Sequence, residues 1–332
     1  MSATALPLPE TSAPRLRWTA LIPVLIAVAL VGYKAIGAAG RLSSGLPPGL
    51  QSGDTLHRTI TYMNTIWPAL VFGVLIAAAV RAFVPASALA RLYGGGMRSN
   101  ALAAATAAPL MLCACCATPL FTGVYERTRK AGPALALMLG APSLNMAALA
   151  FTFVLLGPLH GGVRVALALA LVLLGAPLAA RLAGVAAPLP TPAGIDPYDP
   201  TALGFVRALG HIALRTVPLI VVGVVLSSLL SIAAPPAALA KGFGALAALL
   251  VAATLALPLA LPTFFELPIA LAMLAAGLPA GAATAVLIAG PATNLPSLLT
   301  VGRASSWRLA AAVACAVWLA AVAAGLTVTA LG

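Results

Sequence analysis

Three cysteines within four residues are the side chains best suited to chemistry in this sequence. Cys113, Cys115 and Cys116 lie inside an apolar run that is bracketed by Pro109 and Pro119. Three thiolates form a soft ligand set that suits thiophilic species such as trivalent arsenicals, Cu(I) or reactive sulfur. One cysteine in an apolar run is usually a small packing residue, but three in four positions favour a binding site.

The cysteines can act together only if the backbone around them is irregular. In an unbroken helix Cys113 and Cys116 share a face and Cys115 points elsewhere. The flanking prolines favour a break because each removes an amide donor, and an irregular backbone at membrane depth must line a cavity or be buried in protein. We expect reduced thiols, because the three residues are too close for easy pairing with one another, and Cys315 stands alone and is interpreted as packing.

Glu266 is the second candidate, because it is a carboxylate inside the apolar stretch from Leu259 to Pro268. A charged group at the centre of a bilayer costs about 2.5–3.5 kcal/mol on insertion scales, so it is rarely without a function. One interpretation is that Glu266 exchanges a proton during transport, opposite the cysteines. The other is a carboxylate at a hairpin turn near the membrane surface, and the sequence leaves both open.

Two asparagines stand three residues after a proline, Asn145 after Pro142 and Asn294 after Pro291. An asparagine beside a broken helix can satisfy freed backbone groups or line a path for a solute. We expect both asparagines to contribute to substrate binding. The expected helix breaks are at Pro119, Pro142, Pro268 and Pro291.

The composition is that of an all-α polytopic membrane protein. Charged residues make up 7% of the chain and hydrophobic residues 62%, too few charges to cover a water-soluble domain of 332 residues. The 18 basic residues are dispersed between apolar runs, so we interpret them as topology determinants and expect no nucleic-acid partner. The sequence contains no Gly-x-x-x-x-Gly-Lys-Ser/Thr loop, so we expect no ATP hydrolysis, and it indicates no metal or other cofactor.

The chain contains an internal duplication. Pro68, Gly73, Pro85, Arg91 and Gly94 recur 150 residues later as Pro218, Gly223, Pro235, Lys241 and Gly244, and Pro119, Gly132, Pro142 and Asn145 recur 149 residues later as Pro268, Gly281, Pro291 and Asn294. This predicts an N-terminal transmembrane helix and connection over 1–58, a first permease repeat over 59–184, a Pro-rich linker over 185–206 and a second repeat over 207–332. Repeats with interrupted apolar segments are typical of transporters whose site lies at the repeat interface.

The basic residues also bear on topology. If 101–121 and 245–265 each cross the membrane, nine basic residues lie on each side, whereas re-entrant hairpins give 13 against five. The positive-inside rule favours the second arrangement. We therefore predict inverted repeats with broken or re-entrant helices, about seven to nine membrane segments, and a cytoplasmic N-terminus in the inner (plasma) membrane. The run from Trp18 to Ile36 has bilayer length and is interpreted as an uncleaved helix.

At these residues the chain resembles the ArsP-type permeases, predicted transporters some of which export trivalent organoarsenicals. The resemblance depends on Cys113-Ala-Cys115, Pro119, Gly132 and Pro142-Ser-Leu-Asn145, with a weaker echo in Pro268, Gly281 and Pro291-Ala-Thr-Asn294, and extends over about Ile60 to Leu331. Where family members usually have glycine after the second cysteine, this chain has Cys116. The resemblance implies a permease more firmly than it implies arsenic.

The sequence therefore predicts a permease, not an enzyme, that exports a small thiophilic solute from the cell. Two alternatives remain open: uptake of a sulfur compound, and a membrane thiol–disulfide oxidoreductase. Cys113 and Cys116 have the Cys-x-x-Cys spacing of the second, but no intramembrane partner pair is evident in the second half.

Overall fold

The computed structural model describes residues 67, 70–71, 74–83, 93, 96–110, 112–128, 130–184, 201–233, 244–261 and 264–332. Throughout these ranges the elements are helical and no strand occurs, so the all-α prediction is confirmed. The predicted N-terminal helix in 1–58 and most of the predicted linker at 185–206 lie outside the described residues.

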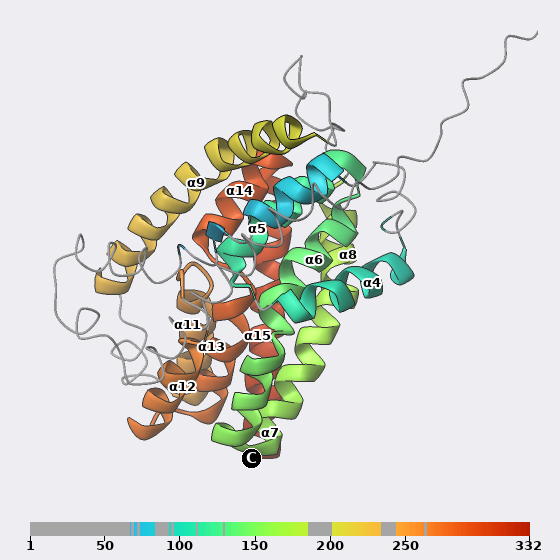
Figure 1. The fold of residues 1–332 in the computed structure, drawn as a ribbon. Helices are drawn as coiled ribbons and strands as arrows, with labels where there is room; N and C mark the ends of the chain where they lie inside the picture. The colour runs from blue at the N-terminus through green and yellow to red at the C-terminus, as the bar shows by residue number, and fades with distance from the viewer. Residues whose placement is uncertain are drawn as a thin grey trace, which may run out of the picture.

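The described elements are helices and helical turns (Figure 1). In chain order they are the helical segment Val74–Phe83, α4 (Met97–Ala107), the 3₁₀ turn η2 (Ala108–Leu110), α5 (Ala114–Thr128), α6 (Ala131–Ser143), α7 (Met146–Ala170), the π-helical turn η3 (Leu171–Gly175), α8 (Ala176–Leu182), α9 (Ala202–Ala233), α11 (Ala245–Ala256), α12 (Glu266–Ala275), α13 (Ala280–Ala292), α14 (Leu295–Ala304) and α15 (Trp307–Leu331).

The core lies around α6 and α13. Every residue of α6 from Pro133 to Ser143 is buried, and α13 is buried almost throughout. Helices that are apolar on all sides belong in the interior, and these two consist mainly of alanine, glycine and leucine. Helix α6 packs against α4, α5 and α8, α13 packs against α11, α12 and α15, and α6 and α13 contact each other. The two central helices thus join the N-terminal and C-terminal parts of the bundle.

The contact between α13 and α15 requires glycine. A Cβ atom on Gly281 would lie 2.6 Å from the carbonyl oxygen of Gly325 and 2.3 Å from Thr329 Oγ1. Small residues of this kind let membrane helices approach closely, since packing and not water exclusion holds them together in lipid.

Helix α7 contains a sharp break at Gly157. This residue has φ 85° and ψ 175°, which no helical residue adopts, and Pro158 follows it. Proline cannot donate an amide hydrogen bond, so the segments before and after Gly157 are two helices joined end to end.

Two helical stretches are long and apolar enough to cross a membrane, Met146–Leu182 and Trp307–Leu331. In each, only 39% of the most apolar window is buried within the protein, so much apolar surface faces outward, as expected against lipid. Helices α13 and α14 pass the same test together but are bent by 43°, which fits a broken span or a re-entrant loop. The number of crossings stays a prediction.

Candidate functional site

The cysteines occupy the start of α5, directly after an irregular connection. Helix α4 ends at Ala107, the turn η2 follows, and Cys113 precedes the first helical residue, Ala114. The carbonyl of Cys113 accepts the first helical hydrogen bond, from the amide of Ala117 at 2.9 Å. Because Cys113 lies outside the helix, its side chain is not confined to the helical face that spacing alone assigns to it.

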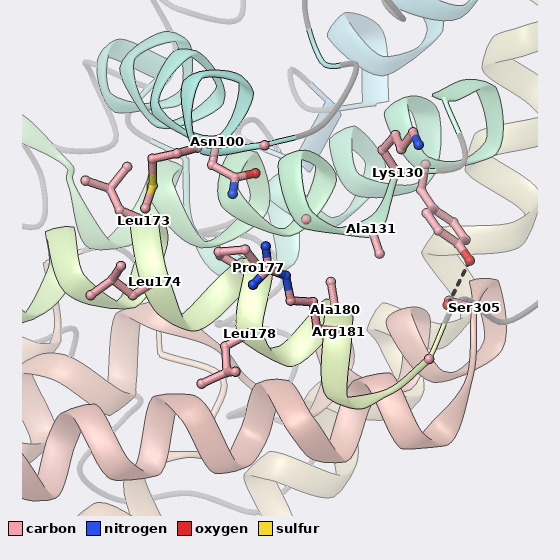
Figure 2. A pocket seen from close by; sticks show the side chains of 15 residues that line it. Asn100, Lys130, Ala131, Leu173, Leu174, Pro177, Leu178, Ala180, Arg181 and Ser305 are labelled. Atoms are coloured by element: carbon pink, nitrogen blue, oxygen red, sulfur yellow. Dashed lines mark hydrogen bonds between the residues drawn. The ribbon is translucent and has the colours of Figure 1, made fainter.

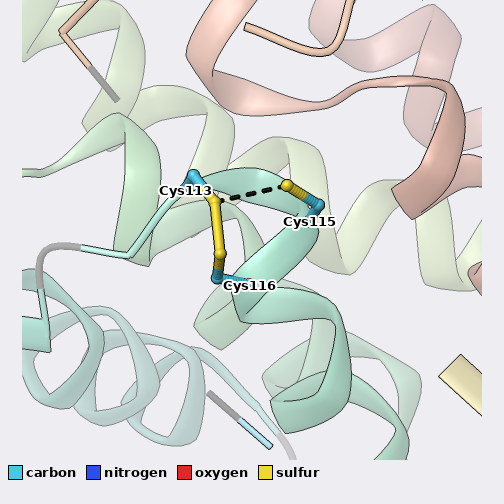
Figure 3. Close-up of side chains that lie close together, drawn as sticks. All are labelled: Cys113, Cys115 and Cys116. Atoms are coloured by element: carbon cyan, nitrogen blue, oxygen red, sulfur yellow. Dashed lines mark hydrogen bonds between the residues drawn. A yellow bond between two sulfur atoms is a disulfide. The ribbon is translucent and has the colours of Figure 1, made fainter. Parts of the chain in front are cut away.

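The structure joins Cys113 and Cys116 by a disulfide (Figure 3). The expectation of three reduced thiols is therefore wrong for these two residues. Their Cα atoms lie 5.2 Å apart, well within the range that a disulfide spans. The reason is local geometry: one residue precedes the helix and the other lies in its first turn, so three residues of separation suffice.

Cys115 lies beside this pair. Its Sγ is 3.3 Å from the Sγ of Cys113, and the three sulfur atoms all lie within 4.8 Å of one another. Each of the three residues is buried, at most 4% exposed. Sulfur atoms at this separation can contact one soft atom together when the thiols are reduced.

The cysteine cluster, meaning Cys113, Cys115 and Cys116, lies near the C-terminal end of α6. Helices α5 and α6 pack together and are joined by only two residues, 129 and 130, so they run antiparallel. The start of α5 is therefore beside the end of α6, where Pro142 and Ser143 precede Asn145. Tertiary packing thus brings two of the predicted site features into one region.

Asn145 and Asn294 both cap helices. Asn145 Oδ1 accepts from the amides of Ala147 and Ala148 at 3.1 and 3.2 Å, and Asn294 Oδ1 accepts from the amide of Ser297 at 3.0 Å. Both asparagines are at most 1% exposed. Their Nδ2 groups are buried and have no hydrogen-bond partner among the described residues. Each asparagine therefore stabilises a helix start with its side-chain oxygen. The two hydrogens on its Nδ2 atom are not used in this cap.

Glu266 forms a buried ion pair with Arg164. Its Oε1 accepts from Arg164 Nη2 at 2.8 Å, and both residues are 1% exposed. Arg164 Nη1 donates to Thr152 Oγ1 at 2.7 Å, and Thr152 in turn donates to the carbonyl of Ala148 at 2.7 Å. The pair bridges α7 and α12, residues 102 positions apart in the sequence.

Arg164 is the residue that the sequence interpretation missed. The sequence interpretation counts it with the topology determinants, although it is the only lysine or arginine between Lys130 and Arg181. The argument that singled out Glu266, the cost of a charge in an apolar stretch, applies to it equally. Arg81 is a second case, since it is buried and paired with Glu126. Neither arginine lies in a loop. The count of basic residues on each side of the membrane is therefore weaker support for the predicted topology.

A gap that is too small to hold a water molecule lies between α6, α7 and α13. Ser143, Arg164 and Pro291 contribute to its wall, so it lies where both predicted helix breaks meet the ion pair. Ser143 Oγ and Arg164 Nε are buried and have no hydrogen-bond partner among the described residues. Unpartnered polar groups at such depth are costly in free energy.

The predicted breaks at Pro119 and Pro268 differ from those at Pro142 and Pro291. Pro119 lies inside α5 and Pro268 lies in the first turn of α12, so neither ends a helix. Pro142 and Pro291 each stand one residue before the last residue of α6 and α13. The helices end at the latter two positions, and the asparagines cap the helices that follow.

Residues 41–185 match a family model described as predicted permease, ArsP_1. The chain is 29% identical to UPF0718 protein YraQ of Escherichia coli (strain K12) over 255 residues, which cover 75% of this chain and 73% of that protein. It is 32% identical over 92 residues to UPF0718 protein MJ0584 of Methanocaldococcus jannaschii, covering 27% of this chain and 25% of that protein. No solved structure matches.

Proposed function

We propose that the chain is a member of the ArsP-type family of predicted permeases and a secondary permease that exports a small thiophilic solute across the cell membrane. The observation that carries the proposal is the buried cluster of three sulfur atoms within 4.8 Å of one another. Trivalent arsenicals, above all methylated ones, are the solutes we favour.

Thiol exchange gives the binding step. A trivalent methylarsenical with two hydroxyl groups exchanges both As–O bonds for As–S bonds, and each departing hydroxide leaves as water with one thiol proton. The step requires reduced thiols, so the Cys113–Cys116 disulfide is the form that does not bind. No net oxidation occurs, and water reverses the exchange on release. The third sulfur offers an exchange partner that lets the arsenic atom move without becoming free.

Two repeated halves would provide alternating access. Helices α6 and α13 begin 149 residues apart and end 149 residues apart, and the helices that start at Met146 and Leu295 keep the same offset. The same offset relates Pro158, which follows the Gly157 break, to Trp307 at the start of α15. In the proposal the halves are inverted repeats, and rocking of one against the other exposes the cysteine cluster to each side in turn.

The asparagines would bind the oxygen atoms of the solute. Nδ2 of Asn145 and of Asn294, together with Arg164 Nε, are buried donors with no partner among the described residues. Hydroxyl or oxo groups on an arsenic or sulfur atom are acceptors that suit them. The solute would thus be held at its soft atom by sulfur and at its oxygens by these donors.

Serine substitution separates the two roles of each asparagine. Asn145→Ser and Asn294→Ser keep a capping oxygen, so we expect stability within a few tenths of a kcal/mol of the wild type, whereas alanine costs about 1 kcal/mol. Serine removes the Nδ2 donor, so each variant should raise KM for the solute about tenfold. Thermal unfolding and vesicle uptake measure the two effects. A serine variant with wild-type KM would contradict the binding role.

Glu266 would couple transport to protons. Protonation would weaken its pairing with Arg164, which bridges helices of the two halves. We expect Glu266→Gln to lose solute accumulation driven by a pH gradient while retaining exchange of labelled for unlabelled solute. Glu126→Gln at the more exposed ion pair with Arg81 is the matched control and should keep both activities. Gradient-driven accumulation at the wild-type rate in Glu266→Gln would refute the coupling.

The disulfide supports a second candidate function, membrane thiol–disulfide exchange. Cys113 and Cys116 have the Cys-x-x-Cys spacing and are paired in the structure. A dithiol substrate would be oxidised as this disulfide is reduced, so electrons and protons balance. A mixed disulfide with a partner, trapped in a Cys113→Ser or Cys116→Ser variant, would favour this function over transport.

Flux in proteoliposomes tests the proposed function. Purified protein is reconstituted with known orientation and offered a panel of trivalent arsenicals and sulfur anions under reducing conditions. Saturable transport of a trivalent arsenical supports the proposal, and the direction of accumulation distinguishes export from uptake. Transport of sulfur anions alone would replace it by the alternative of sulfur uptake.

A further inference from the structure

A cavity lies at the other end of the α5–α6 hairpin from the cysteine cluster. Figure 2 shows the side chains that line it. Its volume is about 800 Å³. Lys130, from the turn between α5 and α6, forms part of its wall together with Ala131 and Gly132 at the start of α6. Residues of η3 and α8 also line it. Ser305, whose Oγ donates to Tyr125 Oη at 3.0 Å, closes it where α14 meets α15.

The cavity carries positive charge. Lys130 and Arg181 both line it, and no described acidic residue does. Neither side chain forms an ion pair with any described residue. Asn100 adds a third polar group and is 2% exposed. Its Oδ1 has no hydrogen-bond partner in the described part of the chain. An anion with hydroxyl groups matches this set of groups.

One wall of the cavity is apolar and faces outward. Leu174 and Leu178 line the cavity one helical turn apart, and they are 57% and 54% exposed. Met97, from α4, also lines the cavity and is 54% exposed. A site for a free inorganic anion has no need of such a wall, whereas an acyl chain packs well along it.

The basic residues of the cavity lie where the surface of the membrane is expected. Arg181 lies in the last turn of α8, at the end of the apolar stretch Met146–Leu182 that is long enough to cross a bilayer. Basic residues at the end of a span lie at the depth of lipid phosphates, and basic pockets between helices there bind anionic headgroups.

We propose that this cavity binds one anionic phospholipid. Lys130 and Arg181 hold the phosphate, Asn100 meets a headgroup hydroxyl, and the acyl chains run along Leu174 and Leu178. The site is separate from the cysteine cluster, and its occupant is a structural lipid and not the transported solute.

Native mass spectrometry of the purified full chain tests the proposal. Phosphatidylglycerol is expected to remain bound at detergent concentrations that strip phosphatidylcholine. The double variant Lys130→Gln/Arg181→Gln should bind phosphatidylglycerol about thirtyfold more weakly, from the attraction that each basic residue exerts on anionic lipid. The matched control is Arg303→Gln/Arg308→Gln, which removes two exposed charges outside the cavity and should bind as the wild type does.

Three results would overturn the proposal. They are equal retention of phosphatidylglycerol and phosphatidylcholine by the wild type, equal weakening in the control variant, and displacement of the lipid by millimolar inorganic phosphate, which would indicate a site for a free anion. The variant Lys130→Arg/Arg181→Lys keeps both charges, so it should retain the lipid and gives a readout even if the glutamine variant folds poorly.

Discussion

Transport of a trivalent methylarsenical is expected to fall to background when Cys113, Cys115 and Cys116 are all replaced by serine. Serine keeps the approximate size of cysteine but replaces the soft sulfur with a hard oxygen. The measurement is uptake into everted vesicles under reducing conditions, at matched protein levels. Cys315→Ser is the control, since Cys315 is exposed on α15 and should be dispensable.

The single variants make this prediction sharper. A methylarsenical needs two sulfur atoms, so each single serine variant should retain transport, reduced about tenfold by loss of one exchange partner. Cys115→Ser leaves the two residues that form the disulfide, so its activity should disappear under oxidising conditions and return with reductant. Undiminished arsenical transport by the triple variant would refute the ligand role of the cluster.

Replacing Arg164 by alanine is expected to destabilise the protein by about 3–5 kcal/mol, because Glu266 would remain as an unpaired buried carboxylate. Glu266→Ala should cost a similar amount for the reciprocal reason. Thermal unfolding in detergent, followed by tryptophan fluorescence, measures both. The pair Arg81–Glu126 is the comparison: the Glu126 side chain is 23% exposed, so Glu126→Ala should cost distinctly less.

A double variant separates stability from function. Arg164→Met/Glu266→Leu replaces the ion pair with apolar groups of similar volume, which is often neutral or stabilising. We expect it to recover the unfolding temperature but not gradient-driven transport, because no protonatable group remains. Arg164→Ala with an unchanged unfolding temperature would show that the pair does not hold α7 and α12 together. A double variant with full gradient-driven transport would remove Glu266 from the mechanism.

Short-range features of the site could be predicted from the sequence. The cysteine cluster is visible as three residues in four, the asparagines by their spacing after proline, and Glu266 by its charge in an apolar run. Each depends on neighbours along the chain. The convergence of the sulfurs was expected as a consequence of an irregular backbone, and Cys113 does lie outside α5. The disulfide was missed because it depends on where the helix begins, to within one residue.

The sequence by itself determined the environment of this protein and the residues on which its proposed chemistry depends. Its apolar composition requires lipid around the helices, and its one dense group of thiols supplies the soft ligands of the proposed site. Only the tertiary structure decided which charges meet. Arg164 and Glu266 are 102 residues apart, and neither residue type nor spacing indicates their pairing. The physical reason is that a buried charge must find a partner, but packing of α7 against α12 selects which one.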